Sequence, residues 1–91
     1  MGRLNYKFTR HALDQLQERG ITEREVRDTV EAGLLVEVSE NRAIRRRIFT
    51  QGYSWVGRNY SHKEVTIVYA LEEGFIIVIT VMARYGRWEG A

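Results

Sequence analysis

Apolar residues recur at helical spacing in the first third of the chain. Ala12, Leu13 and Leu16 fall on one face of a helix, and Gly20 is suited to end it. The pattern therefore predicts a first helix over Thr9–Arg19, with its first residue as the N-cap.

A second helix has the clearest local signal in the sequence. Thr22-Glu23-Arg24-Glu25 matches a capping box, and Ile21 and Val26 are spaced as a hydrophobic staple around it. This signal predicts a helix over Thr22–Ala32. Because so short a connection separates it from the first helix, the two should form a tight helical hairpin.

After the second helix the apolar pattern changes to that of β-strands. The strands expected there are Leu34–Val38, Ile44–Thr50, Tyr53–Tyr60, Val65–Leu71 and Phe75–Met82, and Leu4–Phe8 is expected as a short strand that leads into the first helix. Val65–Leu71 and Phe75–Met82 are apolar on both faces, so they should be central neighbours, and the short turn between them requires antiparallel pairing. The order predicts an α+β domain, with an N-terminal helical hairpin packed on a four- to five-stranded, mainly antiparallel sheet.

Length and composition limit the class of protein. The 91 residues suffice for one domain, over 1–91, and there is no cysteine for disulfides, thiolate catalysis or cysteine-bound zinc. The absence of cysteine favours the cytoplasm. The sequence has no signal peptide and no apolar run long enough to cross a membrane. We therefore expect a cytoplasmic protein without a membrane segment.

The charge is unevenly distributed. Residues 1–41 carry six cations and eight acids, whereas residues 42–91 carry eight cations and four acids, and twelve of the fourteen cations are arginine. Arginine suits forked contacts to phosphate and stacking on bases. A biased genome composition would also enrich arginine, so the excess alone does not decide. The strand-rich half should nevertheless present a basic surface.

Strand geometry divides the run Arg45-Arg46-Arg47. Arg45 and Arg47 should share one face with Phe49, whereas Arg46 shares the other face with Ile44. If one face of the sheet is open, Arg45 and Arg47 should point to it, about 7 Å apart, and could bind phosphate. The alternative is a solvated strand that uses charge to resist aggregation.

Aromatic residues alternate with arginines in two later segments. The residues concerned are Tyr53, Trp55, Arg58 and Tyr60, and then Arg84, Tyr85, Arg87 and Trp88. RNA-binding surfaces combine rings for base stacking with guanidinium groups for phosphate. Tyrosine and tryptophan in strands more often simply pack in the sheet. The second segment is the stronger candidate because it follows the last apolar strand.

His11 is the candidate for proton transfer. It lies near the start of the first helix, where the helix dipole favours the neutral imidazole that a general base requires. His11, Gln15 and Arg19 follow one another as a polar stripe. The alternative is a surface or capping residue without chemistry. Two histidines, His11 and His62, and no cysteine predict no metal site and no cofactor, so any catalysis should be metal-free.

The segments Phe8–Leu13, Glu18–Thr22 and Ile77–Val81 resemble the small family called domain of unknown function 4258. That family is generally placed with RelE-like and BrnT-like toxins. The resemblance implies a RelE-like fold and a metal-independent ribonuclease. It also implies RNA, with mRNA as one candidate, as the substrate, and a neutralising antitoxin, in some cases a zinc-finger protein, as the partner.

The resemblance also implies roles for individual residues. The family's histidine corresponds to His11, its helix-ending arginine to Arg19 and its late-strand threonine to Thr80, whereas Gln15 stands where many relatives have a basic residue. For attack of a ribose 2′-OH on its own phosphate, His11 would be the base or acid.

The remaining assignments complete this hypothesis. Arg19 and Arg47 would stabilise the phosphate, Tyr85 would be the second proton-transfer group, and Thr80 would orient the substrate. The expected RNA-binding residues are Arg45, Arg58, Arg84, Arg87 and Trp88. The alternative hypothesis is a non-catalytic module that binds nucleic acid or an acidic protein through its basic sheet face, with a structural His11.

Overall fold

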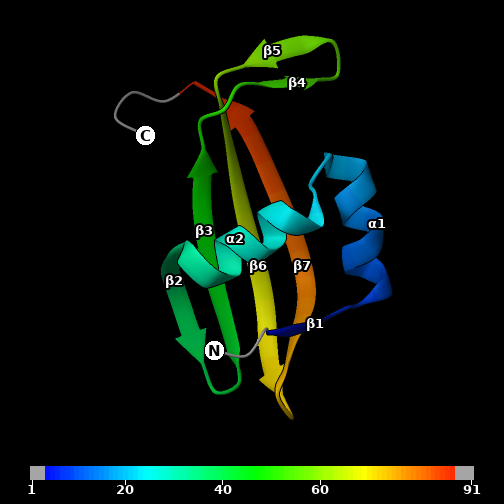
Figure 1. The fold of residues 1–91 in the computed structure, drawn as a ribbon, viewed down its shortest axis with the longest axis vertical. Coiled ribbons are helices and arrows are strands. Elements are labelled where there is room, and N and C mark those ends of the chain that lie inside the picture. The colour runs from blue at the N-terminus through cyan, green and yellow to red at the C-terminus, as the bar shows by residue number, and fades with distance from the viewer. Residues whose placement is uncertain (1–3, 88–91) are drawn as a thin grey trace.

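The structure, a computed structural model, describes residues 4–87 (Figure 1). Most of these residues lie in strands. The elements are β1 (Asn5–Phe8), α1 (Arg10–Arg19), α2 (Glu23–Ala32), β2 (Leu34–Ser39), β3 (Arg42–Phe49), β4 (Tyr53–Trp55), β5 (Arg58–Tyr60), β6 (His62–Glu72) and β7 (Phe75–Gly86).

Five strands form one mixed sheet in the order β1-β7-β6-β3-β2. Strands β6 and β7 are antiparallel neighbours, as predicted, and extend beyond the predicted Val65–Leu71 and Phe75–Met82. Strand β1 pairs with β7 in parallel, with Asn5 opposite Phe75 and Phe8 opposite Val78. The sheet is therefore mixed.

The two helices lie on different parts of the sheet. Helix α1 runs beside β7, beyond the end of β1, whereas α2 crosses β3 and β6 (Figure 1). The predicted helical hairpin packed on a mainly antiparallel sheet is therefore wrong. Each helix has one narrow buried stripe, Ala12 and Gln15 in α1 and Val26, Thr29 and Val30 in α2, and each stripe is used against the sheet. Neither helix has a second apolar face with which to form a hairpin.

The predicted helix boundaries are confirmed. The Thr9 hydroxyl accepts a hydrogen bond from the backbone N–H of Ala12, and Gly20 ends α1 with a φ of 66°. Thr22 and Glu25 form both hydrogen bonds of the capping box at the start of α2. These boundaries depend on contacts over three residues, so the local sequence encodes them.

The hydrophobic core lies between the sheet and the two helices. Its buried residues are Ala12, Ile21, Val26, Val30, Phe49, Val65, Ile67, Tyr69, Ile76, Val78 and Val81. Alternate residues of β6 and β7 supply most of it, as the strand period requires. Neither of the two helices lies over the opposite face of the sheet, which we call the uncovered face.

The predicted strand Tyr53–Tyr60 is instead a hairpin of two short strands. Trp55 pairs with Arg58, and the turn between them consists of Val56 and Gly57, with φ angles of 51° and 75°. The pair β4–β5 forms a separate two-stranded sheet beyond one end of the main sheet (Figure 1).

Candidate nucleic-acid interface

Side chains of helix α1 form hydrogen bonds with backbone groups along the free edge of β7. Strand β1 ends opposite Val78, so the following backbone groups of β7 have no strand neighbour on that side. The side-chain oxygen of Gln15 accepts a hydrogen bond from the N–H of Val81 at 2.8 Å, and Arg19 donates to the carbonyl of Val81 at 2.7 Å. The polar stripe of α1 therefore takes the place of a missing strand.

His11 belongs to the same stripe but lies near the opposite end of α1. It is exposed, and within residues 4–87 its side chain has no hydrogen bond or ion pair. Arg19 lies eight residues further along the helix, about 12 Å along its axis. His11 and Arg19 therefore do not converge on one phosphate.

A pocket forms beside Arg19 at the end of β7. Its lining residues are Arg19, Glu64, Thr66, Met82, Ala83 and Arg84, and its volume is about 370 Å³. We call it the arginine pocket. The sheet register sets Glu64 opposite Arg84 and Thr66 opposite Met82, so strand pairing positions these side chains. Two predicted site residues, Arg19 and Arg84, thus meet here.

The electrostatics of the arginine pocket favour an anion. The Glu64 carboxylate lies 3.7 Å from the Arg46 guanidinium and 3.5 Å from that of Arg84. The lining itself has two guanidinium groups, Arg19 and Arg84, and one carboxylate, a formal charge of +1, and Arg46 beside Glu64 adds a further cation. Both ion pairs are long and the Arg84 side chain is 67% exposed, so the Arg84 guanidinium is accessible to an incoming anion.

Arg45 and Arg47 do not point to the uncovered face, so that prediction is wrong. Arg45 donates to the Tyr69 hydroxyl at 3.0 Å and to the carbonyl of Gly33 at 2.9 Å, and Arg47 donates to the carbonyl of Asp28 at 3.4 Å. Both therefore lie on the face that α2 covers. Alternation shows which residues share a face, but not which face a helix will cover. Carbonyls toward the C-terminal end of α2 attract these cations.

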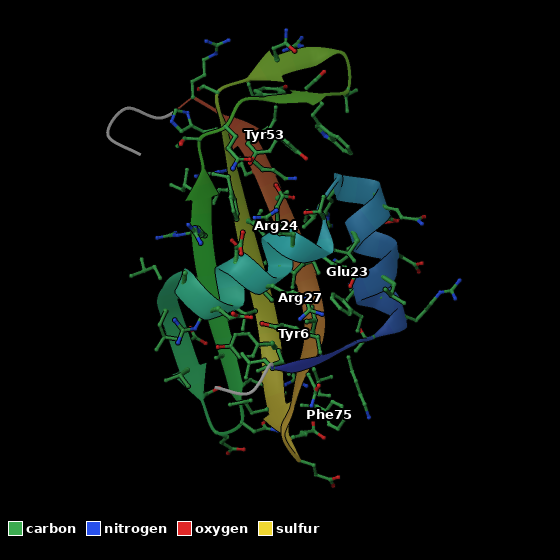
Figure 2. The ribbon with its side chains drawn as sticks, viewed as in Figure 1. Tyr6, Glu23, Arg24, Arg27, Tyr53 and Phe75 are labelled. Carbon is green, nitrogen blue, oxygen red and sulfur yellow. The ribbon has the colours of Figure 1, made fainter. Side chains whose placement is uncertain are left out.

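An aromatic cluster holds the β4–β5 hairpin against the end of β7. The rings of Trp55 and Tyr85 are stacked at 5.3 Å and 10°, while Tyr53 and Tyr60 contact Tyr85 at 6.4 Å and 5.6 Å. Figure 2 shows Tyr53 between the hairpin and the rest of the domain. The aromatic cluster covers Gly20 as well, because a Cβ there would collide with the Trp55 ring. These rings pack in the fold, as the alternative interpretation held.

Sequence reasoning missed a largely buried ion pair beneath the aromatic cluster. The Lys63 ammonium donates to Glu25 at 2.6 Å and to the carbonyl of Gly20 at 2.6 Å, and it lies 5.1 Å and 5.5 Å from the ring centroids of Tyr53 and Tyr85. The Lys63 side chain is 3% exposed and that of Glu25 is 12% exposed. The sequence offered one signal for this pair: Lys63 occupies a position that the alternation of β6 assigns to the buried face.

Tyr85 has a structural contact in this cluster. Its hydroxyl donates to the carbonyl of Arg19 at 2.7 Å. Burial, and then the charge of Glu25, raise the pKa of Tyr85 to about 12. The hydroxyl is therefore protonated at neutral pH and cannot act there as a general base. Its assignment as a proton-transfer group stays a prediction.

The other predicted site residues lie apart from one another. Thr80 pairs with Val68, two residues along β7 from Met82. Arg58 is exposed in β5, and Arg87 donates to the carbonyl of Asn59 at 3.5 Å. Trp88 lies outside the described residues. Within residues 4–87, no three His, Asp or Glu side chains are grouped to hold a metal ion.

Neither described helix is long and apolar enough to cross a membrane.

The fold and the arginine pocket define a small mixed-sheet domain with a cationic site at one end of its sheet. The chain belongs to the family described as Domain of unknown function (DUF4258), whose sequence model matches residues 8–83. The family resemblance is thus confirmed, while its grouping with toxins stays a prediction. No curated protein and no solved structure matches the chain.

Proposed function

We propose that this domain binds RNA through its phosphate backbone at the arginine pocket. The observation that carries the proposal is the meeting of Arg19 and Arg84 in one pocket whose local charge is positive. The hydroxyl-bearing Thr66 adds a hydrogen-bond donor to the lining. Guanidinium groups match phosphate oxygens in geometry and retain their charge at any physiological pH.

Further cations at this end of the sheet favour a polyanion over a small anion. Arg58 is exposed in β5, and Arg87 reaches the neighbouring residue Asn59, so both lie on the hairpin side of β7. Several cations spaced along a surface neutralise successive phosphates. The family resemblance makes RNA, including mRNA, the expected polyanion, and a cysteine-free chain suits the cytoplasm where mRNA is found.

The geometry supports binding better than cleavage. His11 is about 12 Å along α1 from Arg19, and the Tyr85 hydroxyl is engaged by a backbone carbonyl. The second proposal, a metal-independent ribonuclease of a toxin–antitoxin pair with an antitoxin protein as its partner, rests on the family resemblance. It requires a proton-transfer group close to the arginine pocket when RNA is bound.

Salt-dependent RNA binding tests the proposal. We expect the affinity for a fluorescent single-stranded RNA to fall steeply with salt, and Arg84→Gln to reduce the slope by about 0.7, the value for one phosphate contact on a single strand. Arg10→Gln is the matched control, because it removes the same charge from an arginine at the end of α1 that lies away from the arginine pocket. A parent without salt-dependent binding, or equal slopes for both variants, would contradict the proposal.

The same RNA samples test cleavage. Incubation in EDTA followed by end-group analysis detects a cyclic phosphate and a 5′-OH if the 2′-OH attacks its own phosphate. Binding without these products supports the module hypothesis, whereas their appearance supports the ribonuclease.

A further inference from the structure

The tip of the β4–β5 hairpin has an unfavourable residue for its backbone. Val56 has a φ of 51° and Gly57 a φ of 75°, so both central residues of the two-residue turn are left-handed. Such turns favour Asn, Asp or Gly at the first central position. A β-branched residue with positive φ is an outlier, because its side chain crowds the backbone. The local sequence is therefore not optimised for the stability of this turn.

Val56 is also the most exposed of the large apolar residues in the described chain, at 81%. It makes no use of its apolar side chain in the core. Strained backbone tends to persist at binding and catalytic sites, where the surrounding fold enforces it. Here the enforcing contacts are those of the aromatic cluster, in which Trp55 precedes the strained residue and stacks on Tyr85.

The hairpin is anchored on the sequence neighbours of the two arginines that line the arginine pocket. The Trp55 ring covers Gly20, which follows Arg19, and stacks on Tyr85, which follows Arg84. Both arginines line the pocket. The hairpin that bears Val56 is thus held by the sequence neighbours of the two pocket cations, with Tyr85 and Arg84 on opposite faces of β7. Arg58, paired with Trp55, adds an exposed cation to the hairpin.

We propose that Val56 is a base-contacting residue that packs against, or inserts between, nucleobases of an RNA whose phosphate occupies the arginine pocket. This inference rests on the proposed function and assigns the hairpin tip to the same site. Apolar side chains act in this way as wedges between bases, and single-stranded RNA exposes base faces for them. Val56 is apolar although an apolar residue makes the turn less stable, and cations lie on the same hairpin. This combination fits an RNA, in which each base is joined to a negatively charged phosphate.

The substitution Val56→Asn separates stability from binding. Asparagine accepts the left-handed conformation, so we expect the melting temperature to rise by about 4 °C or more. The affinity for a single-stranded RNA should fall at least about fivefold, the lower range for loss of one base contact. Inorganic polyphosphate, which has phosphates but no bases, should bind the parent and the variant equally well.

The chain supplies a matched control in the turn between β6 and β7. Glu73 has the same φ of 51° and is followed by Gly74 with a φ of 83°, and this turn lies at the opposite end of the sheet (Figure 1). Glu73→Asn should leave RNA affinity undiminished, because the turn is far from the proposed site and because the loss of a negative charge does not weaken binding of a polyanion. If Val56→Asn lowers the melting temperature, Val56→Gly, which also accepts positive φ, provides the same test.

The outcomes distinguish the inference from the function on which it rests. A parent that binds neither RNA nor polyphosphate overturns both. A parent that binds both, with Val56→Asn unchanged toward RNA, overturns the role of Val56 and leaves the arginine pocket as the binding site. Equal losses toward RNA and polyphosphate also overturn it, because they would show a general change of the site.

Discussion

Gln15 accepts a hydrogen bond from the backbone N–H of Val81, so a helix side chain completes the edge of a β-sheet. Gln15 is 4% exposed although it is polar. This contact explains why a glutamine suits the position, where a longer basic residue would have no acceptor to offer the N–H. Gln15 therefore has a structural function in this fold.

Replacement of Gln15 by leucine should destabilise the domain. The variant leaves a buried backbone N–H without an acceptor, which costs about 1–3 kcal/mol. Urea unfolding followed by tryptophan fluorescence measures the loss. Gln17→Leu, at an exposed position of the same helix, is the control. Equal stabilities of the two variants would show that Val81 is satisfied in another way.

The Lys63–Glu25 pair should be sensitive to removal of one partner. Lys63→Met leaves the largely buried Glu25 carboxylate without its cation, and the expected loss is about 3 kcal/mol, the lower end for buried pairs. The double variant Lys63→Met with Glu25→Gln should recover part of this loss, because the glutamine oxygen can still cap α2 and no charge remains buried. A single variant as stable as the parent in urea would contradict the structural importance of the pair.

Stability should fall at alkaline pH because of two tyrosines. Burial, together with Glu25, raises the pKa values of Tyr53 and Tyr85 to about 12, above the ordinary value of 10.0. Between these values the unfolded chain loses the phenolic protons while the folded chain retains them, so unfolding is favoured as pH rises through this window. The contribution is fully present below pH 10. Urea unfolding at pH 8 and 11 measures it, and Tyr85→Phe should reduce the difference.

His11→Ala separates the catalytic and structural hypotheses. Since the side chain is exposed and has no hydrogen bond or ion pair within residues 4–87, we expect stability to change by about 0.5 kcal/mol or less. RNA affinity should also be unchanged. If the parent cleaves RNA and the variant loses about 10²–10⁴-fold in rate, His11 is a proton-transfer residue despite its position. Melting temperature, affinity and rate are measured on one preparation.

The sequence predicted the local features of the fold and not their long-range arrangement. Gly20, Thr22 and Glu25 act within one helical turn, so their roles could be inferred from spacing. The parallel pairing of β1 with β7 depends on contacts across most of the chain, for which no local signal exists. The faces of Arg45 and Arg47 were misassigned because the position of α2 is a tertiary property.

The candidate site was predicted in part for the same reason. Arg19 was selected from the family resemblance and Arg84 from its place among aromatic residues, and only the docking of α1 on β7 shows that they share a pocket. Lys63 was overlooked, although it occupies the same strand face as Val65 and Ile67. A lysine at an apolar position of a strand pattern indicates a buried partner, and this signal was available in the sequence.

The pairing of β1 with β7 also bears on how the chain folds during synthesis. Asn5 pairs with Phe75, and α1 docks on β7 through contacts to Val81. The first strand and first helix are therefore translated long before the strand that receives them. A domain whose ends must meet in this way has a high contact order and folds more slowly than one built from local contacts. Strand β1 and helix α1 remain undocked until β7 has left the ribosome.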